Sequence, residues 1–467
     1  MRPGLFIQSG IRGMEREEAL RKISDLLPSS IVLFKPDFSS VKDLESLIMK
    51  ISHIYVIDRG VPEPVIAVDQ EGGNVVRLQW LDYNPSNLFL GELDDVNFTR
   101  YVGALTGYQL SQLGITWNLA PVLDLLNPNN QVILERSFGS DVIKVSRHGS
   151  AYVEGIQRYG VIATAKHFPG HGGVNEDSHL VLPRDNRSYE SIINDAYPFL
   201  SAISSGVRSV MLSHVLYKEV DEDYPASISP KIQELLRKEF RFPGLIITDS
   251  VDMQAVSNHY DKKEVVMKTL RNEVDLIESA DLNDSLELAD IISNTELTNI
   301  KEKMDHITTM MKNHVGFHYE PSSDLLKAIE YTSPRVRRPV LLDPTKKFYI
   351  ILLDSRPESK VYDQNDSLNG LMNEVSKLNI KAEFISGIDS LNALDRDSQF
   401  IFIGRNEHLK KRVWRINEFC EGKKCAFLST GIDKDIGLFD THIGYVSAFS
   451  QKEKVIAGSI AKLLQLF

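Results

Sequence analysis

Residues 161–173 read VIATAKHFPGHGG, an apolar run followed by a loop rich in glycine and histidine. Its first five residues are apolar or β-branched without alternation, which is typical of a strand buried on both faces, as in a parallel sheet. Lys166 and His167 follow at once, and a loop with Pro169 and several glycines comes next. We therefore expect one strand of a parallel sheet here, with polar groups at its carboxyl end.

The first 280 residues contain eight short runs of this kind. Longer segments with helical periodicity separate the runs. Eight such repeats predict an α/β fold whose N-terminal part is a (β/α)8 barrel of the TIM type. The expected strands are Leu5–Ile7, Ile31–Phe34, Val65–Val68, Ile115–Trp117, Val161–Ala165, Ser209–Leu212, Leu245–Ile247 and Val274–Ile277.

A second, shorter alternation of strands and helices follows in the C-terminal part. The 467 residues are enough for two domains. The segment SPRVRRP at 333–339 indicates a linker, and strand-like runs such as Phe348–Leu353 and Phe400–Ile403 come after it. The expected parts are a catalytic barrel at 1–330, a linker at 331–345 and a smaller C-terminal α/β sandwich domain at 346–467.

Polar side chains stand directly after the expected barrel strands. In a barrel of this type the active site lies at the carboxyl ends of the strands, so these residues are the first candidates for chemistry. Each one alone is as well explained by a strand that ends in a polar loop, but the set combines carboxylates, histidines and lysines. It comprises Gln8, Lys35, Asp69, Glu71, Asn118, Lys166, His167, His214, Asp249 and Glu278.

The loop after the fifth expected strand ends in Asp177-Ser178-His179. A carboxylate near an imidazole suits a general acid and base, because a histidine in such a pair titrates near neutrality. His167, His171 and His179 also offer three imidazoles, so a metal site is an alternative, as are three histidines that only form hydrogen bonds. A second motif, GLIITDS at 244–250, favours the acid–base interpretation, because it places Asp249 after the seventh strand.

Several ordered blocks carry a family resemblance. The segment KHFPGHG at 166–172, followed by Asp177-Ser178-His179, resembles the signature of the β-N-acetylglucosaminidases of glycoside hydrolase family 3, in their NagZ-like branch. AVDQEGG at 67–73, APVLD at 120–124, RSFG at 136–139 and PASIS at 225–229 resemble further blocks in the same order. The resemblance extends over most of the barrel.

The resemblance implies a retaining double displacement. Asp249 is the implied nucleophile, His179 the proton donor and base, and Asp177 the carboxylate that tunes His179. The residues implied to hold sugar hydroxyls are Asp69, Arg77, Arg136, Lys166 and His167. No metal or cofactor is expected. Because the loop already supplies His179, we expect the C-terminal domain to be structural or regulatory.

The implied substrate is a small glycan that ends in β-linked N-acetylglucosamine, such as a muropeptide fragment of peptidoglycan recycling or a chitooligosaccharide. Phosphorolysis is an alternative, because a histidine repels an incoming phosphate less than a carboxylate does. A hydrolase with a metal on the three histidines and a carbohydrate-binding module without activity are further alternatives. A binding module, however, has no need of a nucleophile.

The sequence departs from the family pattern at a few positions. Asn74 stands where Arg is frequent, Glu135 where Asp is usual, and Ser250 where a second Asp is frequent. Arg271-Asn272 replaces a common Ala-Gly pair before the eighth strand, which puts the geometry near Glu278 in question. None of these changes removes a proposed catalytic group.

Composition and charge limit the classes of partner that we expect. The net charge of -11 disfavours nucleic acid and anionic lipid, so neither nucleic acid nor a membrane is expected as a partner. The N-terminus resembles no secretory signal and no charge-free stretch is long enough to span a bilayer, so a cytoplasmic location is expected. We expect Cys420 and Cys425 to be two buried thiols rather than a redox pair, and the protein to be a monomer or homodimer.

Overall fold

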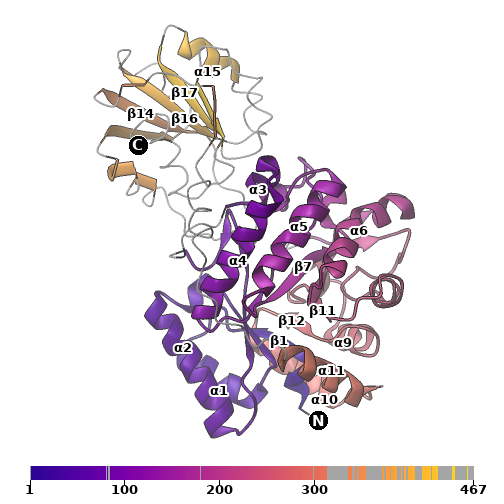
Figure 1. Cartoon of the computed structure of the whole chain (residues 1–467). Coiled ribbons are helices and arrows are strands. Elements are labelled where there is room, and N and C mark those ends of the chain that lie inside the picture. The colour runs from indigo at the N-terminus through magenta and orange to yellow at the C-terminus, as the bar shows by residue number, and fades with distance from the viewer. Residues whose placement is uncertain are drawn as a thin grey trace. The chain divides into compact units, whose positions relative to one another are not determined.

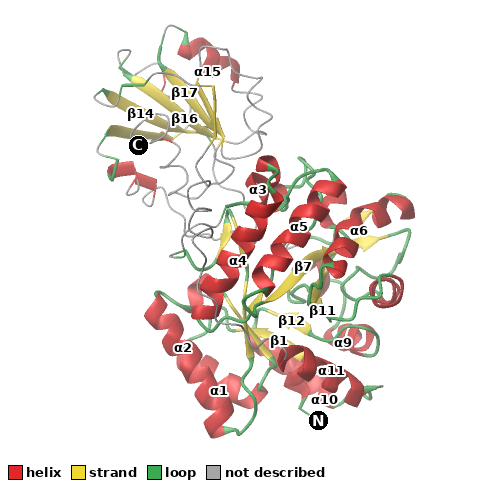
Figure 2. Cartoon of the chain, in the orientation of Figure 1, coloured by secondary structure: helices red, strands yellow, loops and turns green. Residues whose placement is uncertain are grey.

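A computed structural model gives the fold, in which the chain divides into two units. Helices and strands alternate through the larger unit, with the strands inside the ring of helices (Figures 1 and 2). The structure describes residues 2–79, 81, 85–178, 180–297, 299–312, 335–338, 342–343, 346–353, 371–372, 375–378, 380–386, 391, 394–395, 398–404, 413–421, 423–429, 444–447 and 460.

Eight parallel strands form the central sheet of the larger unit. The strand order is β11-β9-β7-β6-β3-β2-β1-β12, and an isolated bridge between Ile247 and Leu276 links the two outer members. The sheet thus closes into the expected (β/α)8 barrel. The strands are β1 (Ile7–Gly10), β2 (Ser30–Leu33), β3 (Val65–Val68), β6 (Trp117–Asn118), β7 (Ile162–Phe168), β9 (Ser209–Leu212), β11 (Leu245–Thr248) and β12 (Ile277–Ser279).

The continuous apolar runs become strands because the barrel buries both of their faces, and every residue of β3, β7 and β11 is buried.

The loops that follow the barrel strands contain four further short strands: β4 (Gln70–Gly72), β5 (Val75–Val76), β8 (Arg184–Asp185) and β10 (Leu216–Tyr217). The barrel helices are α1 (Arg16–Leu26), α2 (Val41–His53), α3 (Asn87–Leu93), α4 (Val96–Gln112), α5 (Val142–Gln157), α6 (Tyr189–Ser204), α7 (Pro230–Glu234), α8 (Gln254–Ser257), α9 (Lys262–Leu270), α10 (Leu282–Ser293) and α11 (Ile300–Lys312).

Three of the expected strands begin at least two residues later than the sequence indicates. One of them is β6, which begins at Trp117 instead of Ile115. Pro3–Phe6 forms a 3-10 turn, so β1 begins at Ile7, and β12 begins only at Ile277. Pro3 favours the turn because its ring fixes φ and leaves no N–H for a strand ladder. Gln8 and Glu278 therefore lie inside strands instead of after them, in register with one another.

The fifth expected strand is longer than the apolar run. β7 continues through Lys166 and His167, because Phe168 still pairs with Leu212 of β9 and Lys166 bridges to Val122. The two polar residues are consequently part of the sheet itself. This placement fixes their backbone positions more firmly than a loop would.

The helices α4 and α5 pack closely through glycines. A Cβ atom on Gly103 would lie 2.6 Å from the carbonyl oxygen of Tyr152, and one on Gly107 would overlap the carbonyl oxygen of Ile156. On the facing helix, a Cβ on Gly155 would overlap the carbonyl oxygen of Arg100. The two backbones approach closely because these residues carry no side chain.

The smaller unit is a sheet with apolar clusters on its two faces. Its strand order is β13-β18-β17-β16-β14-β15, with β13 antiparallel to β18 and the other pairs parallel. Two buried clusters, one around Ile350 and Ile401 and one around Ile351 and Phe402, take alternate residues of the same strands, as a layered α/β domain requires. Its elements are β13 (Arg335–Arg338), β14 (Lys347–Leu352), β15 (Lys381–Ser386), β16 (Gln399–Gly404), α15 (Val413–Cys420), β17 (Cys425–Ser429) and β18 (Gly444–Ser447).

Two features of this unit differ from expectation. Arg335–Arg338 forms strand β13 inside the segment expected to be a linker, while the other expected domain bounds stay predictions. Cys420 and Cys425 are joined in a disulfide, so the expectation of two separate thiols was wrong. Their separation of five residues spans the turn between α15 and β17, which brings the two Cα atoms to 5.9 Å.

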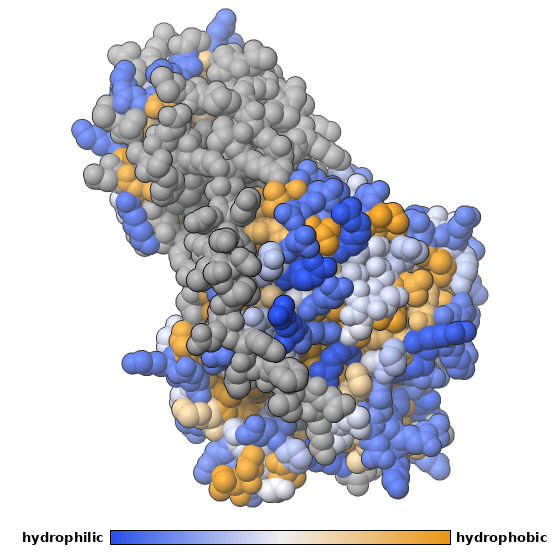
Figure 3. All heavy atoms as spheres, in the orientation of Figure 1, coloured by the Kyte–Doolittle hydropathy of each residue, from blue (hydrophilic) through white to orange (hydrophobic). Residues whose placement is uncertain are grey.

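The described helices include none that is long and apolar enough to cross a membrane. Figure 3 shows a mostly hydrophilic surface over the barrel helices, with separate apolar groups among the polar ones.

Candidate active site

A buried cluster of charges joins the ends of β3 and β7. The ammonium group of Lys166 lies 2.7 Å from Asp69 and 2.7 Å from Glu71, and Arg77 lies 3.3 Å from the other oxygen of Asp69. The side chain of Lys166 is only 3% exposed and that of Asp69 14%. The structure thus brings three predicted sugar-binding residues into one network.

The charges in this cluster balance one another. Burial raises the pKa of Asp69, but the positive charges of Lys166 and Arg77 outweigh burial and hold that pKa below its usual range. Asp69 is therefore a carboxylate at neutral pH. Its ionic partners hold it in a fixed position, which suits hydrogen bonds to a sugar hydroxyl.

Asp124 ends the APVLD block at 120–124, and its position in the sequence alone predicts no role for it. Its carboxylate lies 2.6 Å from Nδ1 of His167 and accepts hydrogen bonds from the backbone N–H groups of His167 and His171. Burial raises the pKa of Asp124, but the charges and hydrogen bonds of the two histidines outweigh it, so the pKa is lowered. The contact orients the His167 ring, because Nδ1 faces a fixed acceptor.

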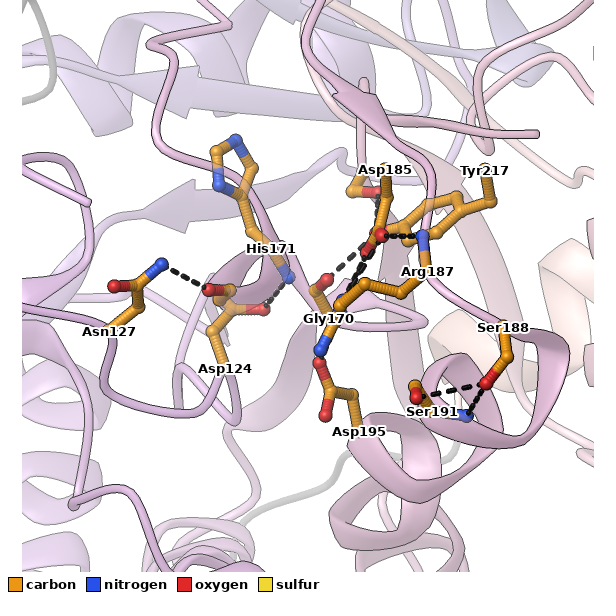
Figure 4. A network of polar contacts seen from close by, with 12 residues as sticks. Asp124, Asn127, Gly170, His171, Asp185, Arg187, Ser188, Ser191, Asp195 and Tyr217 are labelled. Atoms are coloured by element: carbon orange, nitrogen blue, oxygen red, sulfur yellow. Dashed lines mark hydrogen bonds and ion pairs between the residues drawn. The ribbon is translucent and has the colours of Figure 1, made fainter. Parts of the chain in front are cut away.

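The loop after β7 is bound to the barrel mouth by side chains from several other elements (Figure 4). Tyr217 donates a hydrogen bond to the carbonyl oxygen of Gly170 (2.8 Å), Asn130 to that of His171 (2.9 Å) and Asn127 to that of Gly172 (3.0 Å). These contacts hold the start of the segment that leads to Asp177 and His179.

Arg187 forms a second support beside this loop (Figure 4). Its guanidinium bonds both carboxylate oxygens of Asp185 and lies 2.6 Å from Asp195. The hydrogen bonds to Asp185 and Asp195 raise the pKa of Arg187 above its ordinary value, and burial raises that of Asp195. Because Asp195 lies on helix α6, Arg187 links the segment around Asp185 to that helix.

Asp249 directly follows β11 at the carboxyl end of the sheet. Its backbone N–H donates to the carbonyl oxygen of Leu212 on β9, and its carboxylate accepts a 2.8 Å hydrogen bond from the N–H of Ser250. Ser250 also bonds Asp252 and accepts from the N–H of Ala280. The predicted nucleophile therefore stands where a catalytic residue of this fold belongs, with one oxygen fixed by the backbone.

The structure gives fewer contacts for the other predicted site residues. Asp177 is half-buried, and its carbonyl oxygen accepts from the N–H groups of Leu180 and Val181. His179, the predicted proton donor, lies outside the described residues. Arg136 is buried at the end of a 3-10 turn, Leu134–Arg136.

The structure describes two of the three histidines of the metal alternative. His167 and His171 have ring centroids 6.0 Å apart, Nδ1 of His167 faces Asp124, and Nδ1 of His171 lies 3.2 Å from Asn130. Within the described ranges, no three His, Cys, Asp or Glu side chains are grouped as metal ligands. His179 would be the third histidine of such a site.

Known proteins match this chain at the levels of family, sequence and structure. Residues 8–310 match the Glycosyl hydrolase family 3 N terminal domain. The chain is 34% identical to a β-hexosaminidase of Hydrogenovibrio crunogenus over 55% of this chain and 72% of that protein, and 35% identical to one of Neisseria gonorrhoeae over 51% and 67%. A family 3 β-N-acetylglucosaminidase structure from a Paenibacillus species, 25% identical, superposes over 99% of this chain and 96% of that one with a TM-score of 0.85. The chain therefore belongs to glycoside hydrolase family 3 and is a glycoside hydrolase.

Proposed function

We propose that the protein is a retaining, exo-acting β-N-acetylglucosaminidase, which removes terminal β-linked N-acetylglucosamine from small glycans such as muropeptide fragments or chitooligosaccharides. The observation that carries the proposal is the position of Asp249, a backbone-anchored carboxylate at the same edge of the sheet as the Asp69–Lys166–Arg77 cluster. The similarity to proteins named β-hexosaminidase supports the choice of sugar.

The proposed reaction has two displacements. In the first, a carboxylate oxygen of Asp249 bonds to the anomeric carbon while the bond to the leaving oxygen breaks, and His179 gives that oxygen a proton. In the second, a water molecule gives a proton to His179 and bonds to the anomeric carbon, and Asp249 leaves. The configuration at that carbon is thereby retained. Asp177 supports the charge of His179 when the imidazole is protonated.

The binding residues have a common task in this proposal. Asp69, Arg77, Arg136, Lys166 and His167 hold the hydroxyl groups of the terminal sugar. Ionic partners or hydrogen bonds fix Asp69, Lys166 and His167 before substrate arrives, so little reorganisation accompanies binding. Hydrogen bonds from fixed charged groups can strengthen as the ring distorts toward the transition state.

The test is hydrolysis of p-nitrophenyl β-N-acetylglucosaminide in buffer with chelator and without phosphate. We expect the Asp249→Ala variant to lose at least about a thousandfold in kcat, as loss of a nucleophile does. We expect His179→Ala to lose less on this activated leaving group than on a chitooligosaccharide, because a good leaving group needs no proton. Asp290→Ala, an exposed aspartate on α10, is the matched control and should keep the wild-type rate.

Three outcomes would contradict the proposal. If the Asp249→Ala variant stays active, Asp249 is not the nucleophile. If the chelator abolishes activity, the histidine–metal alternative is favoured. A sugar phosphate as the product in phosphate buffer shows a phosphorylase instead of a hydrolase.

Location and assembly belong to this proposal as well. A cytoplasmic enzyme that is a monomer or homodimer fits the recycling of small muropeptides. The disulfide between Cys420 and Cys425, in contrast, is typical of proteins in oxidising compartments. Alkylation of free thiols in protein taken directly from cells distinguishes a cytoplasmic location from an oxidising compartment, because only reduced cysteines react.

A further inference from the structure

Glu278 lies beside the proposed nucleophile on the neighbouring strand. Ile247 of β11 bridges to Leu276, and Asp249 and Glu278 each stand two residues beyond this bridge along the chain. The N–H of Glu278 donates to Thr248 (3.0 Å), and its carbonyl oxygen accepts from Val251 (2.9 Å). The backbone of Glu278 is thus tied to the segment on both sides of Asp249.

The carboxyl group of Glu278 is buried and incompletely paired. The residue is 5% exposed, and no described group forms a hydrogen bond with its Oε2. Gln8, its register partner on β1, donates to Ser30 through Nε2, while its Oε1 likewise has no partner among the described residues. A buried, charged carboxylate oxygen without a hydrogen bond is costly, so a protein keeps such a group only where it is neutral or serves a function.

The charges that face Glu278 are mostly negative. After β11 stand Asp249 and Asp252, after β3 stands Asp69, and β7 contributes Lys166 as the opposing cation. β1 contributes the neutral side chain of Gln8. Burial first, and then the charges of Asp249 and Asp69, raise the pKa of Glu278 well above its usual value.

We propose that Glu278 is a positioning residue that acts through Asp249: it is an uncharged acid in the active enzyme, and its loss of the proton sets the alkaline limit of the first displacement. The inference rests on the proposed role of Asp249 and adds a second carboxyl group to it. Ionised Glu278 would repel Asp249 and compete with Asp69 and Glu71 for Lys166. Both effects would move the nucleophile and the sugar-binding cluster out of position.

The pH dependence of kcat/KM on an aryl N-acetylglucosaminide with a good leaving group tests this role. Such a substrate does not need the proton of His179, so the alkaline limb reports on other groups. We expect Glu278→Gln, which stays neutral, to shift the alkaline limb upward by at least about one pH unit, a tenfold change in proton affinity. Glu278→Asp, which still ionises, should retain an alkaline limb, and Glu264→Gln on α9 should leave the profile unchanged.

An unchanged alkaline limb in Glu278→Gln overturns the inference. So does a raised KM with unchanged kcat, which would mean direct contact with substrate. If the wild type cleaves a different aryl glycoside, the proposed sugar is wrong and the same comparison is made on that glycoside. Independently of activity, the difference infrared spectrum of wild type minus Glu278→Gln at neutral pH should contain the carbonyl band of a protonated carboxyl group, and a carboxylate band there contradicts the inference.

Discussion

One buried carboxylate, Asp124, joins the end of β7 to the start of the loop that follows it. It contacts the ring of His167 and the backbone N–H groups of His167 and His171, and it is fully buried. A buried charge that loses its partner costs far more than an exposed one. Asp124 therefore supports both the stability of the barrel mouth and the position of a sugar-binding histidine.

We predict that Asp124→Asn lowers stability by about 3 kcal/mol, because the amide cannot replace the buried carboxylate as acceptor for all of its hydrogen bonds to His167 and His171. A histidine displaced by an ångström costs about a hundredfold in kcat/KM. Denaturant unfolding and aryl glycosidase kinetics measure the two effects. Asp94→Asn is the matched control, since Asp94 forms a similar pair with His148 but is half exposed, and it should change stability by less than about 1 kcal/mol. Equal effects of the two substitutions would contradict the assigned role.

Glu278 gives stability a dependence on pH. Its pKa is raised in the folded protein above the ordinary 4.5, so between those two values the folded state binds a proton that the unfolded chain releases. The contribution of Glu278 to the free energy of unfolding is fully present below pH 4.5, and it is lost as the pH rises toward the pKa that Glu278 has in the folded protein. We predict that the melting temperature of Glu278→Gln, relative to wild type, increases with pH. A difference that stays constant across a pH series of thermal unfolding would show that Glu278 does not bind the extra proton.

Single residues were predictable where they follow an apolar run. Asp69, Lys166 and Asp249 each stand at the end of such a run, and the structure places them at the barrel mouth. Their partners were not predictable in the same way. The ion pair of Glu71 with Lys166 and the role of Asp124 depend on the directions of side chains from different strands, which sequence spacing does not encode.

At the scale of elements, the eight strands were predictable because burial on both faces leaves continuous apolar runs. Their ends were less so: β1 and β12 begin at Ile7 and Ile277, and β7 extends through Lys166 and His167. Strand ends depend on which neighbour still offers a hydrogen bond, as Leu212 does for Phe168. Helix pairs such as α4 and α5 add a packing constraint that hydrophobic periodicity does not display.

We predict that Gly107→Ala destabilises the barrel by about 1–3 kcal/mol, because the added Cβ meets the backbone of Ile156 on α5 and the helices must separate. Tyr101→Ala on the exposed face of α4 is the control and should change stability by about 0.5 kcal/mol or less. Chemical denaturation of both variants makes the comparison. A neutral Gly107→Ala would show that α4 and α5 do not depend on close backbone contact.

At the scale of the whole molecule, the chain combines a barrel with a second α/β unit that has its own apolar clusters. The second unit was predictable from its alternating strands, but its disulfide was not, since two cysteines five residues apart are equally compatible with free thiols. The proposed nucleophile Asp249 and its partner residue Asp177 both belong to the larger unit. The role of the second unit as a structural or regulatory part remains a prediction.

We propose that Asp249 becomes covalently bound to the sugar during turnover. The most direct measurement is mass spectrometry of peptides from enzyme that is mixed with an activated aryl N-acetylglucosaminide and quenched rapidly in acid. We expect an added N-acetylhexosamine on the peptide that contains Asp249, absent from Asp249→Ala. We also expect the sugar that is released first to keep its anomeric configuration. An adduct on another residue, or a released sugar of inverted configuration, would show that Asp249 is not the nucleophile of a retaining enzyme.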